Sequence, residues 1–120
     1  MLFRSNSSGA DMVISIHQNS YVTPKAEGAQ VFYYKKSEES KRIAQIMQGI
    51  LGEKLGTTRQ IKSDVNYYIL LHSQLPTIIS ECGFLSNPEE EQRLCTEEYQ
   101  ERIADALYCG IIEYLMMNMN

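Results

Sequence analysis

Two chemically versatile residues stand at the ends of the most apolar segments of the chain. His17 follows residues 12–16, and Glu81 follows residues 76–80. Ligand sites of open α/β sheets lie outside the carboxyl ends of the strands. An imidazole and a carboxylate that meet there can form a metal site or an acid–base site. A plainer alternative stays open at this point, in which His17 is a hydrogen-bonded core residue and Glu81 is held in a salt bridge.

The segments that must position these residues alternate between strand and helix patterns. We expect strands near 11–17, 29–34, 59–62 and 76–82, and helices near 38–55, 66–72, 88–95 and 97–117. Ser37, Asn87 and Thr96 are of the types that cap helix N-termini. Apolar residues recur at helical spacing in the two long helices. The predicted fold is α/β, a three-layer sandwich in which helices flank a mostly parallel, mixed sheet.

The alternation of side chains along a strand predicts which residues lie on the same face as His17 and Glu81. His17 shares a face with Ser15, and Glu81 shares one with Ile79, whereas Cys82 points to the opposite face. Cys82 is therefore expected to pack in the core rather than to bind a metal. His72 is expected on the surface of a short helix. Three further acidic residues, Glu89, Glu90 and Glu91, are expected in the first turn of a helix, where the dipole stabilises them.

Composition limits the classes of function. The chain has 120 residues with a net charge of −4, which fits one globular domain and argues against a nucleic-acid partner. It contains no apolar run long enough to span a membrane. The first six residues lack the apolar core of a secretory signal peptide. Three cysteines without CxxC spacing give no zinc-finger or redox motif.

Two longer motifs give the candidates a context. The segment Ser15-Ile16-His17-Gln18-Asn19 resembles the S-I-H-x-N motif of zinc-dependent N-acetylmuramoyl-L-alanine amidases. Residues 81–87, Glu-Cys-Gly-Phe-Leu-Ser-Asn, resemble the same family's E-x-G-F-L-S-N motif. Residues 28–34 match the intervening strand. The sequences of these segments are most similar to those of the spore-cortex amidases of the muramic-lactam-forming type.

The resemblance implies a substrate and a mechanism. Enzymes of this family hydrolyse the amide bond between N-acetylmuramic acid and the L-alanine of the peptidoglycan stem peptide, with a zinc ion that activates water. His17 matches one zinc-ligating histidine, and Glu81 matches the catalytic glutamate. Asn19 matches the motif's asparagine, for which a turn or supporting role is expected rather than a catalytic one.

The chain departs from the family pattern at its start. The family's first strand, its G-H-G-G-like turn with the first zinc histidine, and the following glutamate ligand have no counterpart before His17. We therefore expect residues 1–120 to form the C-terminal two-thirds of an amidase domain that lacks the first strands and helix. One histidine cannot hold zinc tightly, so this chain is expected to bind zinc weakly and to be inactive alone.

Three further expectations follow. An unpaired sheet edge favours self-association. Peptidoglycan as a substrate implies that the full-length protein acts outside the cytoplasm, in the cell wall or spore cortex. The alternative to an enzyme is a non-catalytic amidase remnant that binds peptidoglycan or a protein partner.

Overall fold

The fold combines one small sheet with five helices over residues 2–119, the part of the chain that this computed structural model describes. Met1 and Asn120 of the predicted 1–120 domain lie outside it. The strands are β1 (Val13–Asn19), β2 (Gln30–Tyr33) and β3 (Thr77–Phe84). The helices are α1 (Leu2–Asn6), α2 (Glu38–Leu55), α3 (Tyr68–His72), α4 (Pro88–Leu94) and α5 (Glu97–Met117).

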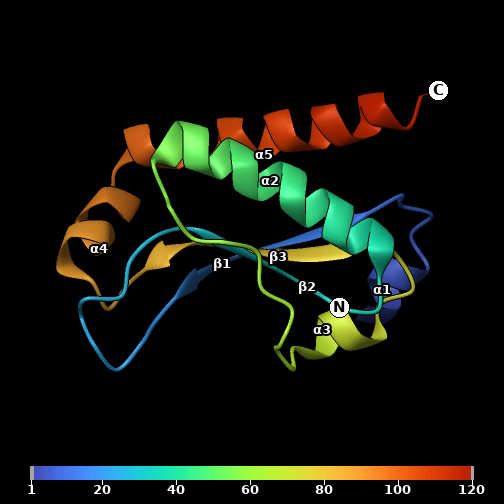
Figure 1. Cartoon of the computed structure of the whole chain (residues 1–120), viewed down its shortest axis with the longest axis horizontal. Helices are drawn as coiled ribbons and strands as arrows, with labels where there is room; N and C mark the ends of the chain where they lie inside the picture. The colour runs from blue at the N-terminus through green and yellow to red at the C-terminus, as the bar shows by residue number, and fades with distance from the viewer. Residues whose placement is uncertain (1, 120) are drawn as a thin grey trace.

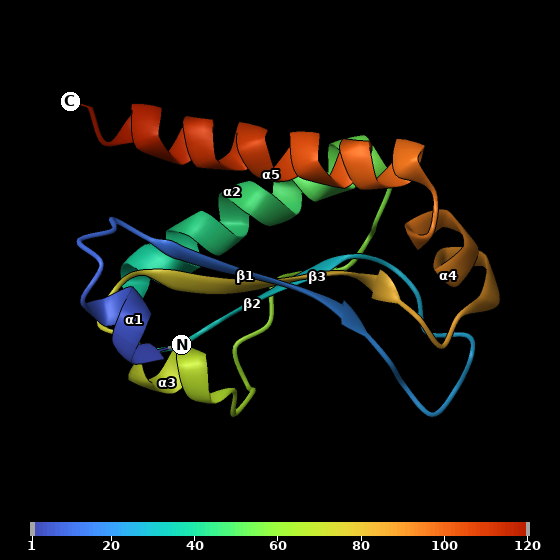
Figure 2. The same ribbon diagram turned by 180° about the vertical axis from the view of Figure 1, so that it is seen from behind.

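The sheet is mixed, and β3 is its centre. The strand order is β1-β3-β2, with β1 parallel and β2 antiparallel to β3. Every residue of β3 is buried, as its continuous apolar run indicated. The outer edge of β1, which lies nearest the viewer in Figure 2, pairs with no strand in residues 2–119. The predicted α/β class with a mixed sheet is confirmed.

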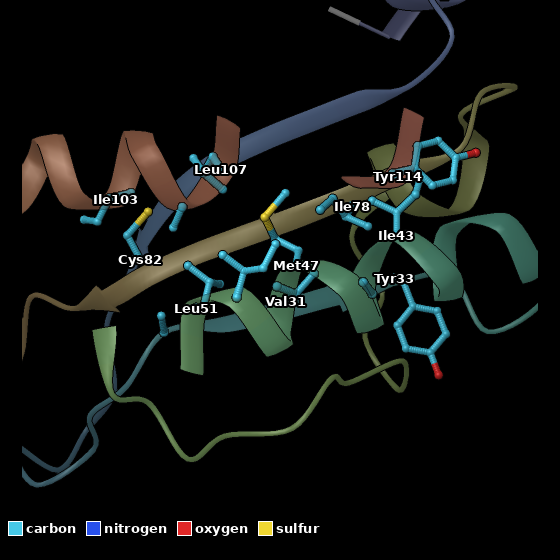
Figure 3. Close-up of a cluster of buried hydrophobic side chains, with 14 of the residues drawn as sticks. Val31, Tyr33, Ile43, Met47, Leu51, Ile78, Cys82, Ile103, Leu107 and Tyr114 are labelled. Atoms are coloured by element: carbon cyan, nitrogen blue, oxygen red, sulfur yellow. The ribbon is translucent and has the colours of Figure 1, made fainter. Parts of the chain in front are cut away.

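The long helices α2 and α5 cover one face of the sheet (Figure 1). Their N-termini are capped as predicted, because Ser37 Oγ accepts from Ser40 N and Thr96 Oγ1 accepts from Tyr99 N. Figure 3 shows the core between these helices and the sheet, where Met47 of α2 lies near Ile78. Gly110 lets α5 approach closely, since a Cβ there would lie 2.5 Å from Met47 Sδ.

The opposite face of the sheet is covered only in part. The short helix α3 lies below the sheet in Figure 1, with α1 beside it. A small cluster of Phe32, Leu70 and Ile79 fills the space between α3 and the sheet. Asn6 Oδ1 accepts a hydrogen bond from Gln74 N, which ties α1 to the loop after α3. The carboxyl ends of β1 and β3 extend beyond this cover.

The predicted strand at 59–62 is wrong. Only Lys62 makes a bridge, to Phe32, and it stands alone. Side chains take up the backbone groups that a fourth strand would need. Gln48 Oε1 accepts from Val31 N at 2.8 Å, and Thr57 Oγ1 donates to Ala29 O at 2.8 Å. With Ala29 O and Val31 N satisfied in this way, only Lys62 of the predicted strand pairs with β2, and residues 59–61 run as a loop. The sequence also gave no indication of α1.

Candidate active site

His17 and Glu81 lie side by side on neighbouring strands. They are register partners in the parallel pair β1–β3, and Gln30 of β2 is the partner of Glu81 on the other side. Partners in register project from the same face of a sheet. The three residues therefore form a row across the face opposite α2 and α5. The structure brings together the two side chains, although they do not end their strands as predicted, since β1 continues to Asn19 and β3 to Phe84.

Glu81 is a buried carboxylate with a free oxygen. The residue is 5% exposed. Of the buried side-chain polar atoms in residues 2–119, only Ser80 Oγ and Glu81 Oε2 lack a hydrogen-bond partner. Burial raises the pKa of Glu81 above its ordinary value, and the neighbouring His17 lowers it by a smaller amount. None of the ion pairs among residues 2–119 includes Glu81, so the alternative of a salt-bridged Glu81 is wrong.

His17 is exposed, so the alternative of a core histidine is also wrong. Its Nε2 lies 2.8 Å from Ser15 Oγ, two residues earlier on the same face. This hydrogen bond restrains the ring, and the side of the ring away from Ser15 stays accessible. An accessible imidazole beside a buried carboxylate is an arrangement suited to ligand binding or to proton transfer.

Asn19 is the last residue of β1. Its Oδ1 accepts from Ser20 N at 2.8 Å, and its backbone carbonyl accepts from Leu85 N at 2.8 Å. These bonds join the ends of the two motif segments, since Asn19 is also the register partner of Phe84. Neither of these hydrogen bonds of Asn19 involves His17 or Glu81.

Sequence reasoning missed two neighbours of this row. The Tyr67 ring lies 5.8 Å from that of Phe32, and its pKa is raised by burial and by the charge of Glu81. Arg59 donates from Nη1 to Gln30 Oε1 at 3.2 Å. Tyr67 precedes α3, and Arg59 lies in the loop that was expected to be a strand. Their positions depend on long-range packing, for which local patterns give no indication.

The residues 2–119 do not provide a complete zinc site. They contain no group of three or more His, Cys, Asp or Glu side chains that could hold a metal ion. The ring of His72 packs against Tyr68 at 4.3 Å between centroids. Cys82 faces the core as predicted, and burial raises its pKa to about 11, which disfavours the thiolate that metals bind. Tight zinc binding needs about three protein ligands.

The fold and this row of side chains define an α/β domain with a candidate hydrolytic acid–base site. A family model described as N-acetylmuramoyl-L-alanine amidase matches residues 2–113. The chain belongs to this amidase family.

Individual relatives agree with this assignment. A germination-specific N-acetylmuramoyl-L-alanine amidase of Bacillus subtilis is 39% identical over 110 residues, which cover 91% of this chain and 46% of the relative. The chain therefore spans about half the length of that relative. A structure of the CwlD amidase from Clostridioides difficile in complex with the GerS lipoprotein matches with a TM-score of 0.91 and 38% identity, covering 96% of this chain and 59% of that one.

A second solved amidase, from Clostridium difficile 630, matches with a TM-score of 0.89 and 33% identity, over 95% of this chain and 62% of that one. The resemblance to N-acetylmuramoyl-L-alanine amidases that the two motifs indicated is confirmed. No helix in the described residues is long and apolar enough to cross a membrane.

Proposed function

We propose that this chain carries the acid–base part of a peptidoglycan amidase that cleaves the bond between N-acetylmuramic acid and the L-alanine of the stem peptide. The supporting observation is the buried carboxylate of Glu81, which has an unpartnered oxygen and lies in register with His17. A buried acceptor that makes no internal hydrogen bond is costly for folding, so its retention suggests use by a ligand or by water. Membership of the amidase family supports amide hydrolysis as that use.

Glu81 is the proton-transfer group in this proposal. Its carboxylate accepts a proton from the water that attacks the lactyl carbonyl carbon. It then donates that proton to the nitrogen of the leaving amine as the C–N bond breaks. The products are a carboxyl group on the lactyl ether and a free amino group on L-alanine. Burial raises the pKa of Glu81, which makes its carboxylate a stronger base for the first step.

His17 is proposed as one zinc ligand, and the other ligands must come from outside the described residues. Zinc bound there would polarise the scissile carbonyl. His17 and His72 are the two histidines of the chain, so they form a matched pair for testing. Zinc titration of the purified chain should show weak binding or none. Tight, stoichiometric zinc in the purified chain would contradict this proposal.

A chimera tests the activity directly. The chain would be joined to the portion of the Bacillus subtilis relative that lies outside the match. We expect this protein to bind zinc and to release free L-alanine amino groups from peptidoglycan, and a chelator should stop the release. His17→Ala should abolish zinc binding and hydrolysis, whereas His72→Ala should retain both. A folded chimera that hydrolyses peptidoglycan equally well without His17 would refute the assignment.

The wider setting follows from the same proposal. We propose action outside the cytoplasm, in the cell wall or spore cortex, as part of muramic-lactam formation in sporulation, and the germination-specific relative supports the link to germination. The open edge of β1 supports self-association, which sedimentation would detect as a dimer.

A non-catalytic peptidoglycan-binding module is the second candidate. It is favoured by the lack of a three-ligand metal cluster in residues 2–119. It predicts that the chain co-sediments with peptidoglycan and that the chimera releases no amino groups. Hydrolysis by the chimera would exclude it.

A further inference from the structure

A small pocket lies beside the Glu81 row and carries two cations. Its volume is about 270 Å³, and its lining includes Asn19, Tyr21, Gln30, Arg59, Lys62 and Phe84. Gln30 joins the pocket to the row, because it is the register partner of Glu81 and accepts a hydrogen bond from Arg59. None of the lining residues is acidic. The pocket is therefore positively charged, although the chain as a whole has a net charge of −4.

Arg59 is held rigidly by neutral groups alone. Its Nε donates to Glu27 O at 2.6 Å, and its Nη1 donates to Gln30 Oε1 at 3.2 Å. Its guanidinium carbon lies 4.8 Å from the centre of the Phe84 ring. The ion pairs in residues 2–119 involve other cations, namely Arg42, Lys54 and Arg93. Arg59 thus keeps an unpaired charge and donor capacity at Nη2, in a fixed orientation.

Lys62 adds a second charge on the same side. It is exposed and has no ion pair among the described residues, while its backbone is fixed by hydrogen bonds to Val31 and Tyr33. A rigid guanidinium with a neighbouring ammonium is suited to a planar anion, because arginine presents its donors as a fork that matches a carboxylate.

We propose that this pocket binds a free carboxylate of the stem peptide, on the residue that follows the L-alanine of the scissile amide. This assignment rests on the proposed function, since it takes Glu81 as the catalytic group. The next residue's carboxylate lies about 7 Å along the chain from the scissile nitrogen, at ~3.5 Å per residue. Gln30 is one strand away from Glu81, a spacing of ~4.8 Å, and Arg59 lies just beyond Gln30. The two spans agree.

This pocket would act on substrate selection rather than on bond cleavage. The side-chain hydrogen bonds of Arg59 go to Glu27 O and Gln30 Oε1 rather than to Glu81. Arg59 can therefore hold the peptide without contacting the base. Stem peptides in which this carboxylate is converted to a carboxamide should bind more weakly, because the fork of Arg59 would lose its anionic partner.

A binding cycle on the 120-residue chain tests the inference without requiring turnover. The probes are the dipeptide of L-alanine followed by D-glutamate, and the same dipeptide with a carboxamide in place of the α-carboxylate. Dissociation constants would come from NMR shifts of the Arg59 side-chain N–H and the backbone amides. We expect the carboxylate form to bind about tenfold more tightly to the parent chain. Arg59→Gln should remove that preference by weakening only the acidic probe.

Three variants guard against misfolding as the cause. Arg59→Lys keeps the charge and loses the fork, so it should retain part of the preference. Lys62→Gln removes an exposed cation without an internal partner and should weaken the acidic probe by about twofold. Lys41→Gln, the same change on the exposed side of α2, should have no effect. Equal affinity of the parent for both probes, or an unchanged preference in Arg59→Gln, would overturn the inference.

Two further measurements distinguish binding of a carboxylate in the pocket from general anion binding and from binding at Glu81. Inorganic phosphate at matched ionic strength should compete less well than the dipeptide, and stronger competition by phosphate would overturn the carboxylate assignment. Glu81→Gln should bind the acidic probe as the parent does. A chain that shows the preference while the chimera fails to hydrolyse peptidoglycan would refute the proposed function alone. Hydrolysis without the preference would refute the pocket alone.

Discussion

Glu81 and Glu90 are buried to nearly the same extent, at 5% and 4% exposure, yet their surroundings differ. Glu90 Oε1 accepts hydrogen bonds from Gly28 N at 3.0 Å and Phe84 N at 2.9 Å, and Oε2 lies 3.8 Å from Arg93. Glu81 Oε2 has no partner. The satisfied carboxylate joins three segments of the fold. The unsatisfied one faces the side of the sheet that the long helices leave uncovered, where a substrate could use it.

The contrast extends to the glycine between them. Gly83 lies where a Cβ would come within 3.3 Å of the Glu90 carboxylate. In the E-x-G-F segment, Glu81 is therefore the proposed catalytic residue, and Gly83 leaves space for the buried carboxylate of Glu90. Phe84 then donates its backbone N–H to Glu90 and offers its ring to Arg59. The structural carboxylate in this way fixes the end of β3, next to the pocket.

The largest expected effect on stability comes from Glu90→Ala. This change leaves the buried N–H groups of Gly28 and Phe84 without their acceptor, which should lower the free energy of unfolding by about 2–4 kcal/mol. Urea denaturation followed by circular dichroism measures it. Glu89→Ala is the matched control on the exposed side of the same turn and should cost less than ~1 kcal/mol. Equal losses in the two variants would contradict a structural role for Glu90.

A smaller effect is expected for Asn87→Ala. Asn87 Oδ1 accepts from Glu89 N and Glu90 N, both at 3.0 Å, and so begins α4 and orients Glu90. Loss of such a cap costs about 1 kcal/mol. Thermal unfolding should show the decrease in the parent background and a smaller one in a Glu90→Ala background, because part of the value of the cap is the placement of Glu90. Full additivity would show that the cap and Glu90 act independently.

The smallest effect concerns Glu81→Gln and its pH dependence. Because burial raises the pKa of Glu81 in the folded state, folding is favoured while the group is protonated, and this contribution is lost as pH rises through the folded-state value. Glutamine carries no charge and escapes that loss. The variant should thus be slightly more stable than the parent at neutral pH, and the difference should vanish below the ordinary pKa of a glutamate. A destabilised variant at neutral pH would indicate that Glu81 is a structural anion.

The helices were the most predictable part of the fold. Caps at Ser37 and Thr96 and the apolar stripes that follow gave α2 and α5 their observed bounds, because these signals are local. The strand predicted at 59–62 failed for the opposite reason. Val31 N of β2 is bound by Gln48, and Ala29 O, just before β2, is bound by Thr57, and both side chains are distant in sequence. Hydrogen bonds between residues so far apart in the sequence cannot be predicted from a local sequence pattern.

The proximity of the two candidate residues was predictable from the sequence, whereas their surroundings were not. Strand ends placed His17 and Glu81 at one edge of a sheet, and the register confirms their approach. Glu90 was expected among the dipole-stabilised acids of a first helical turn, and it occupies that turn. Its buried hydrogen bonds to Gly28 and Phe84 follow only from tertiary packing. The same holds for Arg59, whose loop was expected to be a strand.

The most direct test of the central claim is the rate of amide hydrolysis by the chimera with Glu81→Gln, beside Glu89→Gln as the matched exposed change. The account predicts that Glu81→Gln lowers the rate by about 10²–10⁴-fold while the protein stays folded and retains zinc, and that Glu89→Gln leaves the rate unchanged. A Glu81→Gln protein that releases L-alanine amino groups at the rate of the parent would contradict it.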